Sequence, residues 1–179
     1  MACRRRRYPS PVAIASGCFL ALMALAQTAP AVSAPAALTG PLADLPGRWT
    51  GQGRLGFKDG KIETVTCRAT YFAADDAAEL KQTIRCASPS GKIELKSTLV
   101  EKDGELTGAW SEAMYNLEGQ LTGKVTPRGL VVVVKGLDLD ANMDVIVKDN
   151  RQIVEIQFHN TSLVGMTLIL NRSVAGGES

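Results

Sequence analysis

From Leu45 to about Ser173, hydrophobic and polar residues alternate along the chain with a period of two. In the first stretch Trp49, Leu55 and Phe57 share one row while Arg48 and Thr50 fall on the other. This alternation is typical of β-strands with one buried and one exposed face. It recurs in ten stretches, close to residues 48–57, 64–71, 80–86, 92–99, 106–110, 115–125, 130–134, 143–147, 154–158 and 166–172.

Short segments of turn-forming residues separate these stretches, and they leave no room for a helical crossover. They are Lys58-Asp59-Gly60, Ser88-Pro89-Ser90-Gly91, Lys102-Asp103-Gly104, Pro127-Arg128-Gly129 and Asp149-Asn150. Short connections make neighbouring strands antiparallel. We therefore predict an all-β fold, an antiparallel up-and-down meander of about 8–10 strands closed into a barrel around its own core.

Two cysteines lie symmetrically about one predicted turn. Cys67 and Cys86 are each the tenth residue from the centre of the segment that joins their strands, so antiparallel pairing across the turn Ala74 to Glu79 places them opposite each other. Both also lie on the apolar row of their strands. We predict one disulfide between neighbouring strands, which closes a loop of about 20 residues and contributes roughly 3 kcal/mol.

The N-terminus has the organisation of a secretory signal. A basic start, MACRRRR, precedes the apolar run Val12 to Ala26, which is shorter than the roughly 20 residues that a membrane-spanning helix needs. We predict a signal peptide over 1–26, an Ala/Pro-rich linker over 27–44, a barrel over 45–173 and a disordered tail over 174–179. The mature chain then has no transmembrane segment and is expected in the periplasm or outside the cell. A lipoprotein anchored through Cys18 is the less favoured alternative.

Removing this segment changes the charge of the chain. Arg4 to Arg7 account for four of the 20 Lys and Arg residues, so 16 remain against 18 Asp and Glu, a net charge near −2. This balance argues against a nucleic-acid partner. An exported chain with two cysteines and one histidine favours a disulfide over zinc. We expect no metal and no cofactor.

The first and last strands carry a recognisable pair of residues. Gly47-Arg48-Trp49 opens the first strand, and Arg172 closes the last. This pattern resembles the calycin barrels, which include lipocalins, avidins and fatty-acid-binding proteins, although the helix pair of the last has no counterpart here. The resemblance implies that Arg172 packs across the ring of Trp49, with the guanidinium within about 6 Å of it. The segments GRWTGQG, CRATY, RCAS and GAWSE are also similar to a group of short exported proteins of Gram-negative bacteria.

The predicted barrel has two alternative interiors. Glycines on the inward rows either leave an apolar cavity or permit close approach in a filled barrel. They are Gly51, Gly53, Gly108, Gly119 and Gly123. For the cavity we expect as ligand-binding residues Trp49, Tyr71, Gln82, Trp110 and Tyr115.

Other candidate sites have simpler structural interpretations. Asp138 to Asp144 imitates a calcium loop, but Met143 stands where the sharp turn needs glycine, so we expect an ordinary strand. His159 is the only histidine and has no accompanying catalytic motif, so we expect no catalytic residue and no enzyme. Glu112 and Glu118 flank a turn without an assignable partner. Val131 and Val133 would point outward, either to contact a protein or to be covered by the linker.

These observations leave two functions open. The first is an exported barrel that binds a small apolar molecule inside. The alternative is an envelope protein-contact module, such as a periplasmic protease inhibitor or a structural protein. A large cavity favours the first, whereas a filled barrel with an exposed apolar edge favours the second.

Overall fold

The computed structural model describes residues 37–74 and 78–173. The expected signal peptide, the first part of the expected linker and the expected tail lie outside these ranges. The structure has ten strands, which are β1 (Gly47–Phe57), β2 (Ile62–Ala73), β3 (Glu79–Ser88), β4 (Gly91–Lys102), β5 (Glu105–Glu112), β6 (Leu117–Thr126), β7 (Gly129–Gly136), β8 (Ala141–Lys148), β9 (Arg151–Phe158) and β10 (Leu163–Arg172).

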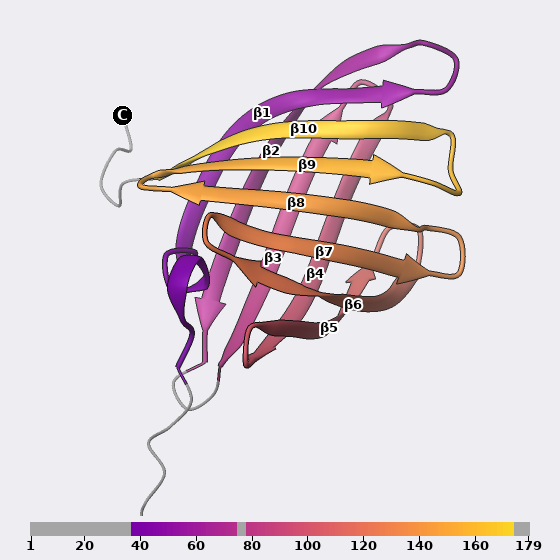
Figure 1. Cartoon of the computed structure of the whole chain (residues 1–179). Helices are drawn as coiled ribbons and strands as arrows, with labels where there is room; N and C mark the ends of the chain where they lie inside the picture. Colours follow the sequence, from indigo (N-terminus) through magenta and orange to yellow (C-terminus); the bar gives the residue numbers. More distant parts are fainter. Residues whose placement is uncertain (1–36, 75–77, 174–179) are drawn as a thin grey trace, which may run out of the picture. The chain divides into compact units, whose positions relative to one another are not determined.

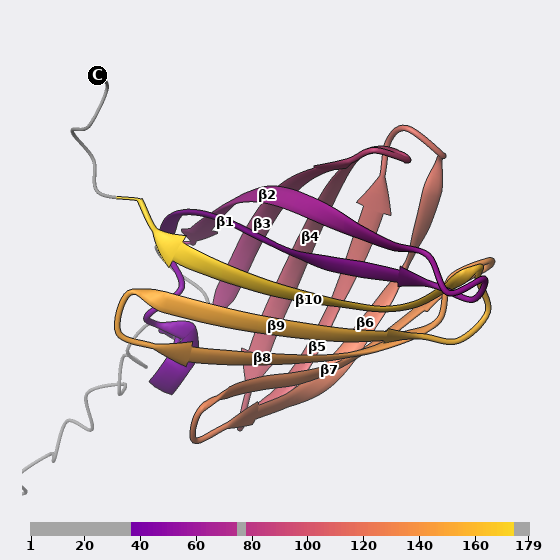
Figure 2. The same ribbon diagram turned by 90° about the horizontal axis from the view of Figure 1, so that it is seen from above.

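The strands form a closed antiparallel barrel in which each strand pairs with its neighbours in sequence and β10 pairs with β1. Figure 1 shows β7 to β10 crossing in front of β2 to β4, and Figure 2 shows the same strands from above. The predicted all-β meander is confirmed. Among the described residues the helical structure is one 3-10 turn, η1 (Gly40–Leu42), and no helix there is long and apolar enough to cross a membrane.

The alternation of the sequence decides which side chains fill the barrel. Trp49 pairs with Arg172 across β1 and β10, and both lie on inward rows. The same rows supply the buried core, which includes Val65, Leu106 and Leu168. Because every strand contributes its apolar row to one interior, the core is continuous around the ring.

The predicted disulfide is present. Cys67 and Cys86 face each other on β2 and β3, with their Cα atoms 4.2 Å apart. Both are buried among the core residues. The bridge therefore fastens the two strands from inside the barrel.

The chain before β1 closes one end of the barrel, which we call the base. Leu42 in η1 and Leu45 are fully buried, and η1 contacts β6 and β7. Thr39 donates a hydrogen bond to Glu101 on β4, at 3.3 Å. The expected linker ended at residue 44, whereas the structure packs its last residues against the barrel, because two leucines interrupt the Ala/Pro-rich composition.

The inward glycines allow neighbouring strands to approach closely. A Cβ atom at Gly53 would overlap the carbonyl oxygen of Thr167 and lie 2.8 Å from Leu168 Cδ2. One at Gly119 would lie 2.7 Å from the indole nitrogen of Trp110. Close approach, one of the two expected reasons for these glycines, is thus observed, and it occurs together with a hollow interior.

Candidate functional site: an apolar cavity in the barrel

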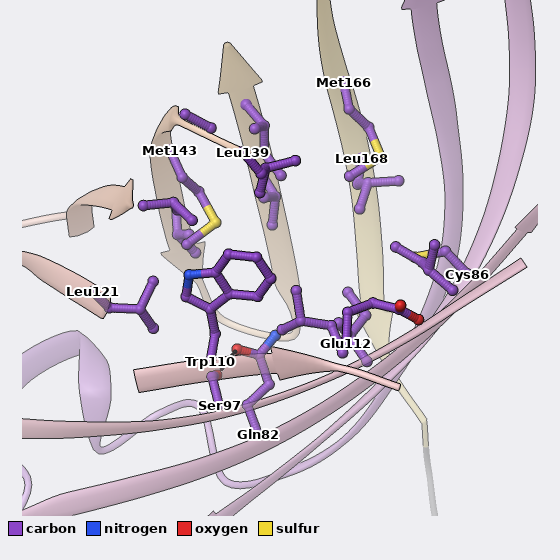
Figure 3. A pocket seen from close by; sticks show the side chains of 18 of the residues that line it. Gln82, Cys86, Ser97, Trp110, Glu112, Leu121, Leu139, Met143, Met166 and Leu168 are labelled. Carbon is purple, nitrogen blue, oxygen red and sulfur yellow. Dashed lines mark hydrogen bonds between the residues drawn. The ribbon is translucent and has the colours of Figure 1, made fainter. Parts of the chain in front are cut away.

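The interior holds a cavity of about 310 Å³. It runs from Leu45 at the base toward the opposite end, which we call the mouth and which carries the turns after β1, β3, β5, β7 and β9. Tyr115, in the turn after β5, lines the cavity and is 60% exposed, so the cavity opens there. Most of the wall is aliphatic or aromatic, as Figure 3 shows for Leu121, Leu139, Met143, Met166 and Leu168.

The expected pair of Trp49 and Arg172 closes the base of the barrel. The Cζ atom of Arg172 lies 4.4 Å from the centroid of the Trp49 ring, and the Trp49 indole donates a hydrogen bond to the Leu45 carbonyl at 2.8 Å. Trp49 is fully buried and does not line the cavity, contrary to the expectation that it would be a ligand-binding residue. Its ring is covered by Arg172 and its N–H is already paired, so Leu45 forms the cavity floor instead.

A polar pair lies near the base. Tyr71 lines the cavity and donates a hydrogen bond to Gln152 Oε1 at 2.9 Å. Burial raises the pKa of the Tyr71 hydroxyl, and the bond to Gln152 offsets this only in part, so the phenol is neutral. The amide nitrogen of fully buried Gln152 has no hydrogen-bond partner among the described residues.

Gln82 and Trp110, which the sequence also predicts as ligand-binding residues, place polar groups in the middle of the cavity wall. Gln82 accepts a hydrogen bond from the Ser97 hydroxyl at 3.0 Å. Trp110 presents its ring to the cavity and donates its indole N–H to the carbonyl of Lys135 at 3.2 Å. The structure therefore brings Tyr71, Gln82, Trp110 and Tyr115 together around one space.

Of the residues that the structure describes, Glu112 is the one charged residue of the cavity wall. It ends β5 and is only 5% exposed. Its Oε1 accepts the backbone N–H of Glu94 at 3.0 Å, and its Oε2 accepts that of Tyr115 at 2.7 Å. Burial acts to raise the pKa of this carboxyl, but the backbone N–H donors of Tyr115, Glu94 and Met114 outweigh it, and the net pKa is lowered. The cavity thus contains a buried carboxylate in its ionised form.

A second buried carboxylate, Glu63, fastens two turns at the mouth. Lys61 Nζ lies 2.6 Å from Oε1, Ser88 donates its hydroxyl to Oε2 at 2.7 Å, and Ser90 donates both its hydroxyl and its backbone N–H. The hydrogen bonds from Lys61, Ser90 and Ser88 lower the pKa of Glu63 to about 2. This cluster joins the turn after β1 to the turn after β3.

Sequence reasoning missed the roles of both glutamates, although the parity of their strands contained the signal. Glu112 continues the inward row of Leu106 and Trp110, and Glu63 begins that of Val65 and Cys67. A polar residue on an otherwise apolar row is either buried with partners or placed in a cavity. Glu118, on the other side of the same turn, lies on the outward row of β6 and is exposed.

The aspartates of the calcium-like segment, His159 and the outward valines do not line the cavity. Asp140 is paired with Lys135, 2.7 Å away, and His159 is exposed in the turn after β9. Val131 is exposed on the outer face of β7, and Val133 is partly covered. Within residues 37–74 and 78–173, no group of three or more His, Cys, Asp or Glu side chains is arranged to hold a metal ion.

Comparison with known proteins shows the fold and no more. No protein-family model and no curated protein sequence matches the chain. Among solved structures, the S-type phycobiliprotein lyase of Guillardia theta is similar, with a TM-score of 0.51 and 13% sequence identity. The match covers 75% of this chain and 92% of the lyase. This likeness concerns the fold alone.

Proposed function

We propose that the protein is an exported carrier that binds a small apolar molecule inside its barrel. The observation that carries this proposal is the cavity of about 310 Å³ with its largely apolar wall. Pockets for small molecules typically measure about 300–1,000 Å³ and combine an apolar wall with a few placed polar groups. The likeness in fold to a phycobiliprotein lyase is compatible with a barrel that binds a small molecule.

A packing defect is a poor explanation for a cavity of this size. Protein interiors are close-packed and contain few voids larger than a water molecule, so an apolar space of about 310 Å³ is far outside ordinary packing. A bound apolar molecule would restore contacts along the wall.

Export is part of the proposal and is supported by the sequence and the disulfide. The basic and apolar N-terminus fits a signal peptide that delivers the chain to the periplasm or beyond, and a buried Cys67–Cys86 bridge suits an oxidising compartment. Membership in the group of short exported Gram-negative proteins belongs to the same proposal. The alternative protein-contact function has less support, since the interior is hollow and each strand is paired on both sides.

Native mass spectrometry of protein purified without detergent from the cells that produce it tests the proposal, because it reports a bound small molecule and a bound protein in one measurement. We expect a small-molecule adduct. Ala141→Phe, which adds a ring at the cavity wall, should remove the adduct. Asn142→Phe adds the same ring on the outer face of the same strand and should retain it. A protein partner without any small-molecule adduct would support the contact module instead.

A further inference from the structure

Glu112 brings a negative charge into the cavity and has no positive partner in the part of the chain that the structure describes. The carboxylates that form ion pairs within the described residues are Glu63, Glu79, Glu94, Glu105 and Asp140. Glu112 is not among them, and the charged side chain that acts on it, Glu94, is also negative. A buried charge is costly unless it is paired and hydrogen-bonded. The backbone donors supply the hydrogen bonds and leave the charge unbalanced.

The carboxylate retains capacity for another donor. Two carboxylate oxygens offer about four acceptor sites in total. In Glu112 the backbone N–H groups of Glu94 and Tyr115 engage one oxygen each at 3.0 and 2.7 Å, and that of Met114 also acts on the carboxylate, so at least one acceptor site is left. A ligand group that donates to this carboxylate therefore does not have to displace the turn that Glu112 stabilises.

An aromatic ring lies close to the same position. Trp110 and Glu112 are two residues apart on the inward row of β5, so their Cβ atoms lie about 7 Å apart. Tyr115 stands at the rim beside them. A carboxylate with tryptophan and tyrosine faces nearby is the set of groups that attracts an ammonium group.

The rest of the wall disfavours a ligand with a negatively charged head. Among the described residues no Lys, Arg or His lines the cavity, so a carboxylate or phosphate head would find no cation there and would face Glu112. The neutral polar groups Gln82 and Ser97 are bonded to each other. The wall beyond Glu112 consists mainly of Leu, Ile, Val, Met and Phe side chains, which suit a hydrocarbon body.

We infer that the cavity takes an amphiphilic amine: a molecule with an apolar body in the barrel and one positively charged nitrogen at Glu112 near the mouth. This inference rests on the proposed function. The cavity of about 310 Å³ is at the lower end of the range for small-molecule pockets, so a medium-length chain such as decyl is a suitable probe.

Three probes with the same chain and different heads test the inference: decylamine, 1-decanol and decanoate. Their affinities for the lipid-stripped protein are measured by isothermal titration calorimetry at neutral pH. We expect decylamine to bind at least about tenfold more tightly than decanoate. Glu112→Gln should reduce this ratio to less than about threefold. Glu118→Gln removes the same charge from the outer face near the same turn and should leave the ratio unchanged.

The outcomes separate the two proposals. If the three probes bind with similar affinities, or if Glu112→Gln keeps the preference, the amine inference is overturned while the apolar binding function stands. If none of them binds, the proposed function fails and the inference fails with it. Because Glu112→Gln removes an acceptor from the turn and can lower folding yield, the wild-type ratio of decylamine to decanoate decides the question where that variant does not fold.

Discussion

The guanidinium of Arg172 lies over the indole of Trp49, 4.4 Å from the ring centroid, at the place where the last strand meets the first. The same guanidinium donates hydrogen bonds to the carbonyls of Pro46, at 2.6 Å, and Asp44. These contacts join β1, β10 and the segment that closes the base. One side chain thus stabilises both barrel closure and the cavity floor.

Replacing either Arg172 or Trp49 should remove most of the stability that their contact contributes. We expect Arg172→Ala and Trp49→Ala to be non-additive in a double-mutant cycle, with a coupling of roughly 0.5–2 kcal/mol. Arg172→Lys should recover only part of the loss, since an ammonium group lacks the planar stack and the fork that reaches two carbonyls. Urea denaturation of the four proteins measures the coupling. Strict additivity would mean that the stacking contact contributes nothing to stability.

The disulfide should matter chiefly for stability. Cys67 and Cys86 are 19 residues apart, and opening the loop should lower the free energy of unfolding by roughly 3 kcal/mol. Intact mass with and without reduction, followed by alkylation and peptide mapping, should show one bridge between Cys67 and Cys86. Alkylation of these two cysteines without reduction would overturn the assignment.

The periodicity of the sequence is sufficient to predict the barrel, and it bears on two of the contacts inside it. Parity placed Cys67 opposite Cys86 and Trp49 on the row of Leu55 and Phe57, and the resemblance to calycin barrels paired Trp49 with Arg172. The placements by parity follow because a strand has a strict period of two and a meander pairs each strand with its neighbour in sequence. The structure bears out both relationships.

The contents of the barrel were less predictable, for two physical reasons. Period-two alternation identifies the inward row but says nothing about volume, so a filled and a hollow barrel gave the same pattern. The segment before β1 has no periodicity, so the burial of Leu42 and Leu45 at the base, and hence the exclusion of Trp49 from the cavity, could not be read from it. Glu112 was visible as a polar residue on an apolar row, but its backbone partners come from another strand and from the next turn.

Calcium should leave the protein unchanged. Asp140, in the middle of the calcium-like segment, is engaged by Lys135 and by the amide of Asn160 at 3.3 Å. The hydrogen bond from Lys135 lowers the pKa of Asp140 despite the opposing effect of burial. We expect the melting temperature to be the same with millimolar calcium and with a chelator. A saturable rise that Asp140→Ala abolishes would reveal a calcium site.

Two glycines of the same strand should differ sharply in their tolerance of a methyl group. A Cβ at Gly53 would meet the Thr167 carbonyl and Leu168, whereas one at Gly56 has its nearest neighbour, the Gly165 oxygen, 3.8 Å away. Gly53→Ala should therefore destabilise the barrel by about 1–3 kcal/mol, the range for overpacking, and Gly56→Ala should have a much smaller effect. Thermal and urea denaturation compare the two variants. Equal losses would show that the close approach of β1 and β10 is not what requires glycine.

Glu63 should give the protein a characteristic sensitivity to acid. The hydrogen bonds from Lys61, Ser90 and Ser88 lower its pKa from 4.5 to about 2 in the folded state. The folded protein thus binds a proton at Glu63 less readily than the unfolded chain does. Linkage then makes this contribution to stability fully present above about pH 4.5, and it is lost as the pH falls toward about 2.

A glutamine at this position removes the titrating group and keeps the shape of the side chain. Glu63→Gln should be less stable than the parent at neutral pH, because the amide cannot accept hydrogen bonds at both positions and cannot pair with Lys61. Its stability should also fall less steeply between about pH 4.5 and about 2, so that the two curves converge in acid. Urea denaturation across this range measures both curves, and Glu155→Gln, an exposed position on the outer face of β9, is the matched control. If Glu63→Gln and the parent lose stability in parallel down to the lowest pH, the bonds at the mouth do not favour the ionised carboxylate, and another group must account for the acid sensitivity of the fold.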